Sequence, residues 1–312
     1  MSNYIAIDIG GTQTRAALFA TQSSTPILTQ RISTQKESET PLDRLLGLIA
    51  SIWEQSQPVL AIGVAAASPV DPYRGIVIDA PNIPGWVNLP LRQYIEDRFH
   101  VPVALGNDAN LAALAEWKFG AGKGHRNMIY ITVSTGIGGG VILDNQLLLG
   151  ERGMAGELGH ITVLPDGPLC GCGQRGHLEA VASGPSIARW VELELGQGIP
   201  SILKAGHSLT AKEVASAASQ GDALAKAAFQ RAGTFIGRTF ADYLHIFNPT
   251  AIIVGGGVSR SGPLIFDPIR AAMQSSVMSP QFLDNLTLTT AALGDEVGLM
   301  GALALAQNLI EK

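Results

Sequence analysis

The sequence contains little charge, no long hydrophobic run and only two cysteines, Cys170 and Cys172. Of its 312 residues, 15% are charged and 46% are hydrophobic, so a large buried core is expected and an intrinsically disordered chain is excluded. The net charge is −5, the pI is about 5.7, and no run of lysine and arginine occurs, which argues against a surface for nucleic acid or anionic membranes. No apolar run approaches the ~18 residues of a membrane span, and no signal peptide is visible. We therefore expect a soluble, cytoplasmic protein.

The first part of the chain is expected to form three strands and then to alternate helices with strands. The sequence predicts that a helix begins at Thr40 and Pro41, because Thr40 can cap the N-terminus of the helix and proline is favoured in the first turn. The expected strands are Tyr4–Ile9, Arg15–Ala20, Ile27–Ser33, Val59–Ala65, Gly75–Ala80 and Val101–Leu105. The expected helices start at Pro41 and span Leu91–Phe99 and Leu111–Phe119.

The pattern of strand, glycine turn and strand then recurs. The expected strands are Met128–Val133, Val141–Leu143, Gln146–Leu149, Ala251–Val254 and Leu286–Thr290. The helical part contains a capping box at Thr210 and Glu213 and a long helix from Asp222 to Phe247. Because no linker separates the halves, we expect an α/β fold of two packed lobes with a cleft between them. The smaller lobe would comprise residues 1–118, completed by a C-terminal helix at about 296–312, and the larger lobe residues 119–295.

Three glycine-rich turns follow buried strands, at Asp8–Thr14 (DIGGTQT), Ser134–Gly140 (STGIGGG) and Val254–Ser259 (VGGGVS). Glycine lets the backbone approach a phosphate closely, and nearby hydroxyls and amides supply hydrogen bonds. Ordinary tight hairpins are the alternative for either of the first two turns taken alone. The first turn is not a dinucleotide-binding motif, because it precedes a strand and not a helix. Gly122-Lys123-Gly124 does not match the Walker A sequence either.

Together these turns resemble those of the actin-like ATPase and sugar-kinase superfamily, in which two lobes clamp a nucleotide. The resemblance implies that Asp8 helps to organise Mg²⁺ around the phosphates. A turn-capping aspartate is the alternative interpretation of this residue.

A second acidic residue at a strand end is Asp108, in the stretch GNDAN. It could cap the following helix. In the context of a cleft it could instead orient a sugar hydroxyl and accept its proton, which phosphorylation of that hydroxyl requires. The neighbouring Asn107, and Asn82 in APNIPGW, carry amides that both donate and accept hydrogen bonds and therefore suit sugar hydroxyls.

Two glutamates flank the loop that contains both cysteines. Glu157 and His160 occur in GELGH before the loop, and Glu179 occurs in HLEA after it. Solvated loop residues are the simpler interpretation of the glutamates. A fold in the loop, however, would bring the two carboxylates together.

DIGGTQTR, APNIPGW, GNDAN, TVSTGIGGG, AGELGH and PLCGCGQRGHLE occur in this order, and they resemble the ROK family (repressors, open reading frames, kinases), nearest its kinases of the bacterial glucokinase type. The resemblance covers essentially the whole chain. It implies that Asp108 is the catalytic base, that ATP with Mg²⁺ is the phosphoryl donor, and that the chain forms a homodimer or tetramer. It implies as sugar ligands Asn82, Asn107, Asp108, Glu157, His160 and Glu179. It implies as nucleotide contacts Asp8, Gly10, Gly11, Thr12, Thr135, Gly136, Gly138, Gly255, Gly256 and Gly257.

The resemblance also implies a role for the two cysteines. The family loop is a zinc site of one histidine and three cysteines, but the position of the last cysteine is His177 here. The implied ligands to a structural Zn²⁺ are His160, Cys170, Cys172 and His177, a set of two sulfur and two nitrogen atoms that tetrahedral zinc accepts. A disulfide is the alternative, but a Cys-x-Cys bridge is strained and a cytoplasmic compartment is reducing.

The leading hypothesis is an ATP-dependent kinase for the 6-hydroxyl of a hexose, with glucose favoured. Fructose, mannose and N-acetylhexosamines are the alternative substrates, and polyphosphate is an alternative donor. A sugar-responsive repressor of the same family is disfavoured, because such proteins carry a helix-turn-helix segment before the first strand and only three residues precede Tyr4. A non-catalytic sugar sensor would be expected to lack the acid or the phosphate turns, and both are present.

Overall fold

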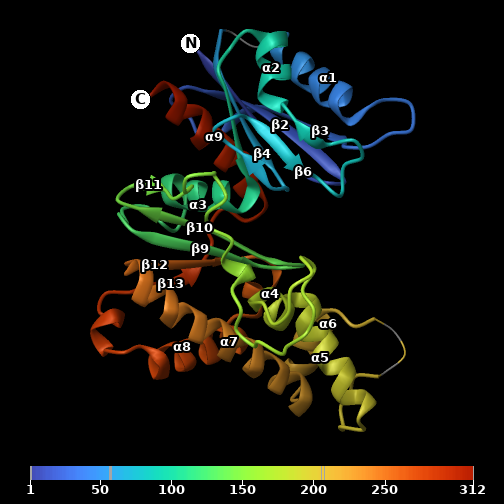
Figure 1. The fold of residues 1–312 in the computed structure, drawn as a ribbon, viewed down its shortest axis with the longest axis vertical. Coiled ribbons are helices and arrows are strands. Elements are labelled where there is room, and N and C mark those ends of the chain that lie inside the picture. Colours follow the sequence, from blue (N-terminus) through green and yellow to red (C-terminus); the bar gives the residue numbers. More distant parts are fainter. Residues whose placement is uncertain (1, 56–57, 205, 207, 312) are drawn as a thin grey trace. The chain divides into compact units, whose positions relative to one another are not determined.

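The computed structural model describes residues 2–55, 58–204, 206 and 208–311 (Figure 1). The chain divides into two compact units. The first unit comprises Met1–Gly124, Gly140–Gly156 and Ala292–Lys312, and the second comprises His125–Gly139 and Glu157–Ala291. In the part of the chain that the model describes, no helix combines the length and the apolar character needed to cross a membrane.

The first unit is built on a mixed sheet in the order β3-β2-β1-β4-β8. Its strands are β1 (Asn3–Ile9), β2 (Gln13–Ala20), β3 (Pro26–Ser33), β4 (Val59–Ala66) and β8 (Val103–Asn107). The first three strands are antiparallel, whereas β4 and β8 run parallel to β1, so the predicted initial run of three strands is confirmed. Almost every residue of β1 and β4 is buried, which is typical of strands covered on both faces.

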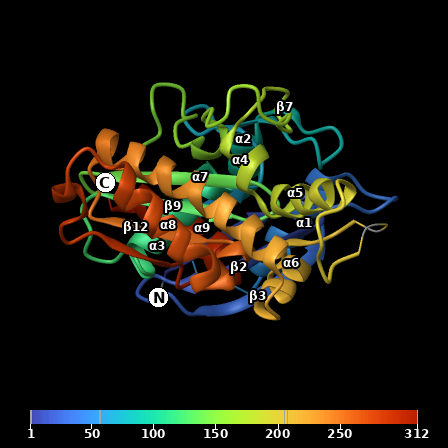
Figure 2. The ribbon, with the colours of Figure 1, turned by 90° about the horizontal axis from the view of Figure 1, so that it is seen from below.

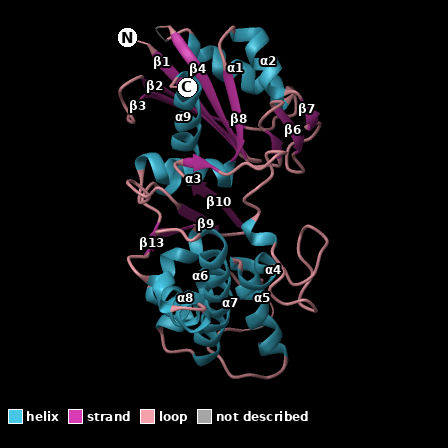
Figure 3. Cartoon of the chain, turned by 60° about the vertical axis from the view of Figure 1, so that its left-hand side comes forward, coloured by secondary structure: helices cyan, strands magenta, loops and turns pink. Residues whose placement is uncertain are grey.

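Helices cover both faces of this sheet (Figure 3). Alternate residues of β1 point to opposite faces, so Ile5, Ile7 and Ile9 join one core and Tyr4 and Ala6 join the other. The isoleucine core is closed by α1 (Pro41–Trp53) and α2 (Leu91–Phe99), and the other core by α3 (Asp108–Phe119) and α9 (Val297–Ile310).

One glycine in the sheet allows α9 to pack closely. A Cβ atom at Gly63 in β4 would lie 1.9 Å from the carbonyl oxygen of Ala302 in α9. Only glycine therefore fits at this point of contact between helix and sheet.

A small antiparallel sheet of β5 (Val70–Asp71), β6 (Ile76–Asp79) and β7 (Val87–Leu89) lies in the same unit. The sequence predicted β6 but neither neighbour. Strands of two and three residues are too short to show an alternating pattern. The loop between β6 and β7 contains the stretch APNIPGW.

The second sheet has the order β11-β10-β9-β12-β13. Its strands are β9 (Met128–Val133), β10 (Ile137–Leu143), β11 (Gln146–Leu147), β12 (Ala251–Gly255) and β13 (Thr287–Thr290). The predicted start of the returning strand at Val141 was wrong, because three of the glycines are strand residues. A Cβ atom at Gly139 would lie 2.5 Å from a methyl group of Leu158, and one at Gly140 would lie 2.7 Å from the Cβ of Ala113. Tertiary packing therefore requires glycine inside a strand, where sequence suggests a turn.

The helices of the second unit surround one long helix, α7 (Ala223–Phe247) (Figure 2). Asp222 caps its start by accepting a hydrogen bond from the backbone N–H of Ala225, and Asn248 ends it in a left-handed conformation before Pro249. The sequence predicted this helix with both of its ends. Packed against it are α4 (Leu178–Ala182), α5 (Gly184–Gly196), α6 (Ala211–Ser219) and α8 (Pro263–Ser276).

The predicted capping box is confirmed at the start of α6, whereas α8 was not predicted as a separate helix. Short 3-10 turns complete the second unit at η1 (Leu158–His160), η2 (Gly257–Ser261) and η3 (Pro280–Leu283). In the first unit, η4 (Gly294–Glu296) leads into α9.

A buried carboxylate joins distant segments of the first unit. The side chain of Glu116 in α3 has no exposed surface, and its oxygens accept hydrogen bonds from the backbone N–H groups of Ala121, Ala292 and Leu293 at 2.8–3.1 Å. Ala121 lies shortly before the chain first leaves this unit, and Ala292 lies where the chain returns to it for the last time. Glu116 therefore fixes two segments that are far apart in sequence, at Ala121 and at Ala292, to one helix.

We expect Glu116→Gln to lower the free energy of unfolding by at least about 2 kcal/mol, because a hydrogen bond to a charged group contributes about 1.5–3 kcal/mol and the amide would direct its own N–H toward backbone donors. Thermal unfolding followed by circular dichroism measures the change. Glu311→Gln is the matched control in the same unit: its carboxylate is 60% exposed and pairs with Lys118 at 3.1 Å, so a small shift is expected. Equal shifts for the two variants would contradict the assigned role of Glu116.

Candidate functional site

The first glycine turn joins β1 to β2 and is held from two sides. The N–H of Gly10 donates to the carbonyl of Gln13 at 2.9 Å, and the hydroxyl of Thr34 donates to the carbonyl of Gly10 at 2.7 Å. A Cβ atom at Gly11 would lie 2.7 Å from the Cβ of Asn82, so this glycine is needed for the turn to contact the APNIPGW loop. The turn leaves the side chain of Thr12 exposed.

The APNIPGW loop presents Asn82 to solvent on two buried anchors. Ile83 and Trp86 are buried, and they are joined by a backbone hydrogen bond between the N–H of Trp86 and the carbonyl of Ile83. The amide nitrogen of Gln35 donates to the carbonyl of Asn82 at 2.6 Å and to the carbonyl of Gly11 at 3.2 Å. Gln35 therefore ties the predicted sugar loop to the predicted phosphate turn.

Asp8 at the end of β1 forms an ion pair with Arg15 of β2 at 2.6 Å. The same guanidinium donates to the carbonyl of Asp295 and lies 3.5 Å from the carboxylate of Glu296. A Cβ atom at Gly298 would lie 2.6 Å from the carboxylate of Asp8, so α9 begins directly against this acid. Asp8 is thus held at one end of β1, beside the first glycine turn.

The structure corrects the predicted start of α3, which is Asp108 and not Leu111. The cap of this helix is Asn107: its side-chain oxygen accepts hydrogen bonds from the N–H groups of Ala109 and Asn110 at 3.0 and 3.3 Å. Its amide nitrogen donates to the carbonyl of Ser68 at 3.3 Å. The oxygen of Asn107 is therefore committed to the helix, and one N–H of its amide remains for a ligand.

Asp108 is the first residue of α3 and not its cap. One of its carboxylate oxygens accepts a hydrogen bond from the N–H of Ala109 at 2.8 Å, and the side chain is half-buried. The partial positive charge at the start of a helix stabilises a carboxylate in the first turn. The carboxylate of Asp108 therefore lies between the end of β8 and the first turn of α3.

In the second unit, the glycine turn after β9 is fixed at both ends. At its start, the carbonyl of Ser134 accepts a hydrogen bond from the N–H of Gly184 at 2.8 Å. At its end, the N–H of Ile137 donates to the carboxylate of Glu179 at 3.0 Å. The turn leaves Thr135 exposed and Gly136 and Gly138 half-buried.

A cavity of about 580 Å³ lies beside this turn. Thr135 contributes to its wall, as does Gly257 from the third glycine turn, in which Gly256 has a φ of 84° that favours glycine. Gly255 at the end of β12 is buried against the ring of Tyr130. The remaining wall is largely apolar and is formed by Pro185, Leu209, Ala211, Ala215 and Val258, with Ser134, Gly184, Thr210, Lys212, Arg260 and Ser261.

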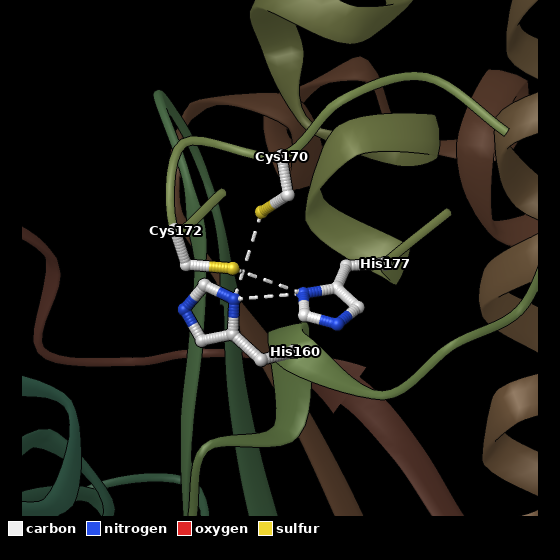
Figure 4. Close-up of side chains that lie close together, drawn as sticks. All are labelled: His160, Cys170, Cys172 and His177. Carbon is white, nitrogen blue, oxygen red and sulfur yellow. Dashed lines mark hydrogen bonds between the residues drawn. The ribbon is translucent and has the colours of Figure 1, made fainter. Parts of the chain in front are cut away.

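The cysteine loop brings together the four predicted metal ligands, His160, Cys170, Cys172 and His177 (Figure 4). The Nδ1 atoms of the two histidines lie 3.4 Å apart. The sulfur of Cys170 lies 3.7 Å from Nδ1 of His160, and the sulfur of Cys172 lies 3.3 Å from Nδ1 of His177. Both cysteines are free thiols.

These distances fit a tetrahedral metal ion. With Zn–N of about 2.0–2.1 Å and Zn–S of about 2.3 Å, tetrahedral zinc holds its ligand atoms about 3.3–3.8 Å apart. All four candidate ligand atoms lie within 4.8 Å of one another. Burial raises the pKa of the Cys170 thiol to about 11, so metal binding would release its proton.

Both predicted glutamates contact members of this cluster. A carboxylate oxygen of Glu157 lies 3.9 Å from Nε2 of His160, the ring nitrogen that faces away from the other ligands. The thiol of Cys170 donates to Glu179 at 3.4 Å. The loop therefore places both carboxylates beside the cluster.

The predicted sugar ligands belong to both units. Asn82, Asn107 and Asp108 lie in the first unit, whereas Glu157, His160 and Glu179 lie in the second. Sequence reasoning did not identify Arg15 or Gln35. The hairpin register, which pairs Asp8 with Arg15 across two strands, was a usable signal for the first of these. Nothing local marks Gln35, because its contacts come from the loop around Asn82, 47 residues away.

Comparison with known proteins identifies the family. The family model "ROK family" matches residues 4–309. A curated glucokinase from Streptomyces coelicolor is 36% identical, with 97% of both chains covered. A crystal structure of a ROK hexokinase from Thermus thermophilus superposes with a TM-score of 0.83 at 33% identity, covering 99% of each chain.

A ROK family glucokinase from Streptomyces griseus, solved in complex with glucose and AMPPNP, has a TM-score of 0.78 at 37% identity and covers 98% of this chain and 99% of its own. The predicted α/β fold of the actin-like ATPase and sugar-kinase class is therefore confirmed. Because the family match extends over nearly the whole sequence and the relatives are matched over nearly their whole length, the chain belongs to the ROK family.

Proposed function

We propose that this protein is a glucokinase that transfers the γ-phosphoryl group of ATP to the 6-hydroxyl of glucose. The observation that carries the proposal is the match to curated glucokinases at 35–36% identity over 97–98% of their length. The structure with glucose and AMPPNP belongs to a relative of similar identity and supports the same pair of substrates.

The three glycine turns are proposed to bind the nucleotide. Thr135 and Gly257 line the cavity of about 580 Å³, whose apolar wall suits a nucleoside. Mg²⁺ bound near Asp8 would neutralise charge on the phosphates. The proposed nucleotide contacts are Asp8, Gly10, Gly11, Thr12, Thr135, Gly136, Gly138, Gly255, Gly256 and Gly257.

Asp108 is proposed to be the general base. Its carboxylate accepts the proton of the 6-hydroxyl as that oxygen bonds to the γ-phosphorus, the bond from phosphorus to the bridging oxygen breaks, and ADP leaves. The hydrogen bond from the N–H of Ala109 orients the carboxylate at the start of α3. Asn82, Asn107, Glu157, His160 and Glu179 are proposed to hold the sugar.

The cluster of two histidines and two cysteines is proposed to bind a structural Zn²⁺. His160 would use Nδ1 for the metal, which leaves Nε2, on the side of Glu157, for a sugar hydroxyl. The metal would fix the loop that presents Glu157 and Glu179.

The remaining proposals concern the organisation of the protein. The first unit would serve as the smaller lobe and the second as the larger lobe of the kinase. A cytoplasmic homodimer or tetramer is proposed on family resemblance, and sedimentation equilibrium measures the number of subunits.

A coupled assay for ADP release tests the activity itself. With ATP and Mg²⁺, we expect glucose to give a higher kcat/KM than fructose, mannose, N-acetylglucosamine or N-acetylmannosamine. Parallel reactions with polyphosphate in place of ATP distinguish the donors. A clear preference for another sugar would replace glucose as the substrate, and no turnover with any of them would contradict a kinase.

Asp108→Asn should lower kcat by at least about 10²-fold, because general-base catalysis contributes about 10²–10⁴-fold and the amide cannot accept the proton. Its dissociation constant for glucose, measured by calorimetry, should change by less than about tenfold, since the loss is confined to the transition state.

Glu157→Gln is the matched comparison, because it removes a carboxylate that is proposed to bind the sugar and takes no part in proton transfer. It should mainly weaken glucose binding and leave kcat less affected. Normal turnover of Asp108→Asn would show that this aspartate only stabilises the first turn of α3.

Protein purified without added metal should contain about one zinc per chain, because four ligands of this type form a closed structural site. His177→Cys should retain the metal, since a thiolate replaces an imidazole at the same corner. His177→Ala should lose both zinc and thermal stability. Elemental analysis by mass spectrometry measures the zinc content, and thermal unfolding measures the stability. An active, stable protein that contains no zinc would rule the site out.

A further inference from the structure

We propose that Glu179 is a positioning residue for the nucleotide: its carboxylate fixes the glycine turn Ser134–Ile137 through the N–H of Ile137. The proposal rests on the kinase function above and adds a second role to a residue that is expected to bind the sugar.

The contact between Glu179 and the turn is direct and close. The N–H of Ile137 donates to the Oε2 atom of Glu179 at 3.0 Å. A Cβ atom at Gly136 would lie 2.5 Å from the same oxygen. The turn therefore needs glycine at this position so that the carboxylate can reach the backbone.

Glu179 is itself fixed by its surroundings. Its backbone carbonyl accepts hydrogen bonds from the hydroxyl of Ser186 at 2.9 Å and from the N–H of Ser183 at 3.2 Å. Its neighbours in α4, Leu178 and Ala180, are buried. The backbone that carries the Glu179 side chain is therefore fixed, so the carboxylate projects toward the turn from a rigid position.

The turn is thus held at two points by one short region of the chain. Gly184, five residues after Glu179, donates its N–H to the carbonyl of Ser134 at the start of the turn. Glu179 accepts the N–H of Ile137 at its end. The residues between these two points, Thr135 and Gly136, are the proposed phosphate contacts, so their backbone would be ordered before the nucleotide arrives.

The other carboxylate oxygen of Glu179 faces the cysteine loop, where the thiol of Cys170 contacts it at 3.4 Å. One oxygen therefore contacts the glycine turn, and the other contacts the cysteine loop. This division predicts that nucleotide binding depends on Glu179 even when no sugar is present.

The experiment measures the affinity for a non-hydrolysable ATP analogue with Mg²⁺, without sugar, by calorimetry. Glu179→Ala should weaken binding by about tenfold, which corresponds to the loss of one hydrogen bond to a charged group. Glu179→Gln should bind the analogue within about threefold of the unsubstituted protein, because its amide oxygen still accepts the N–H of Ile137. Both variants should bind glucose more weakly.

Glu157→Ala is the matched control. It removes a carboxylate that lies beside His160 at 3.9 Å and, among the described residues, forms no hydrogen bond with the glycine turn. It should weaken glucose binding and leave the affinity for the analogue unchanged.

Gly136→Ala tests the same contact from the other partner. Gly136 does not have a positive φ, so the added methyl group acts chiefly by displacing the carboxylate. It should weaken analogue binding by about tenfold in the unsubstituted protein, and much less in the Glu179→Ala background, where the displaced group is absent.

Zinc content is measured in every variant and should not change. Unchanged analogue affinity in both Glu179→Ala and Gly136→Ala would overturn the proposal. If Glu179→Ala loses zinc or fails to fold, Gly136→Ala and Glu179→Gln decide the question: the proposal fails unless the first weakens analogue binding and the second retains it. If the variants change the affinity for the analogue as predicted but the protein phosphorylates no hexose, the proposed function is contradicted and the role of the contact is not.

Discussion

The carboxylate of Glu116 is removed from water, and its oxygens are bound by backbone N–H groups at both ends of a long excursion of the chain. A buried charge of this kind is tolerated only when hydrogen bonds replace its hydration. The N–H donors belong to Ala121, Ala292 and Leu293, which lie outside α3, in segments where the chain leaves and re-enters the first unit. The residues that Glu116 holds at Ala292 and Leu293 directly precede η4 and α9, which packs against the sheet and places Gly298 against Asp8.

The second unit also has a helix carboxylate that accepts hydrogen bonds from distant segments, but this carboxylate is less buried than that of Glu116. Glu179 is half-buried and accepts an N–H from the glycine turn and a thiol from the cysteine loop. In both units a carboxylate on a helix orders a segment that lies elsewhere in the sequence. The two histidines and two cysteines of the proposed zinc site likewise come together from separate positions in the chain, with their ligand atoms within 4.8 Å of one another.

Several glycines of the turns serve packing in addition to any contact with phosphate. Because glycine has no Cβ atom, Gly11 leaves space for Asn82, Gly136 for Glu179, and Gly140 for α3. Each of these glycines allows a proposed ligand or its supporting helix to approach the backbone. The closeness of the glycine turns to the polar residues is therefore a property of local packing within each unit.

The sequence by itself determined the elements that have a periodic pattern or an explicit end: the first three strands, the long α7 with its cap and its Asn-Pro stop, and the ordered motifs that indicate the ROK family. The resemblance to the ROK family also predicted that His160, Cys170, Cys172 and His177 form one set of metal ligands, and their side chains lie together in the structure. Tertiary structure alone decided the start of β10 and the partners of Gln35 and Glu179. In each case the deciding contact comes from a residue far along the chain, or from a glycine chosen for what packs against it, and neither leaves a local pattern.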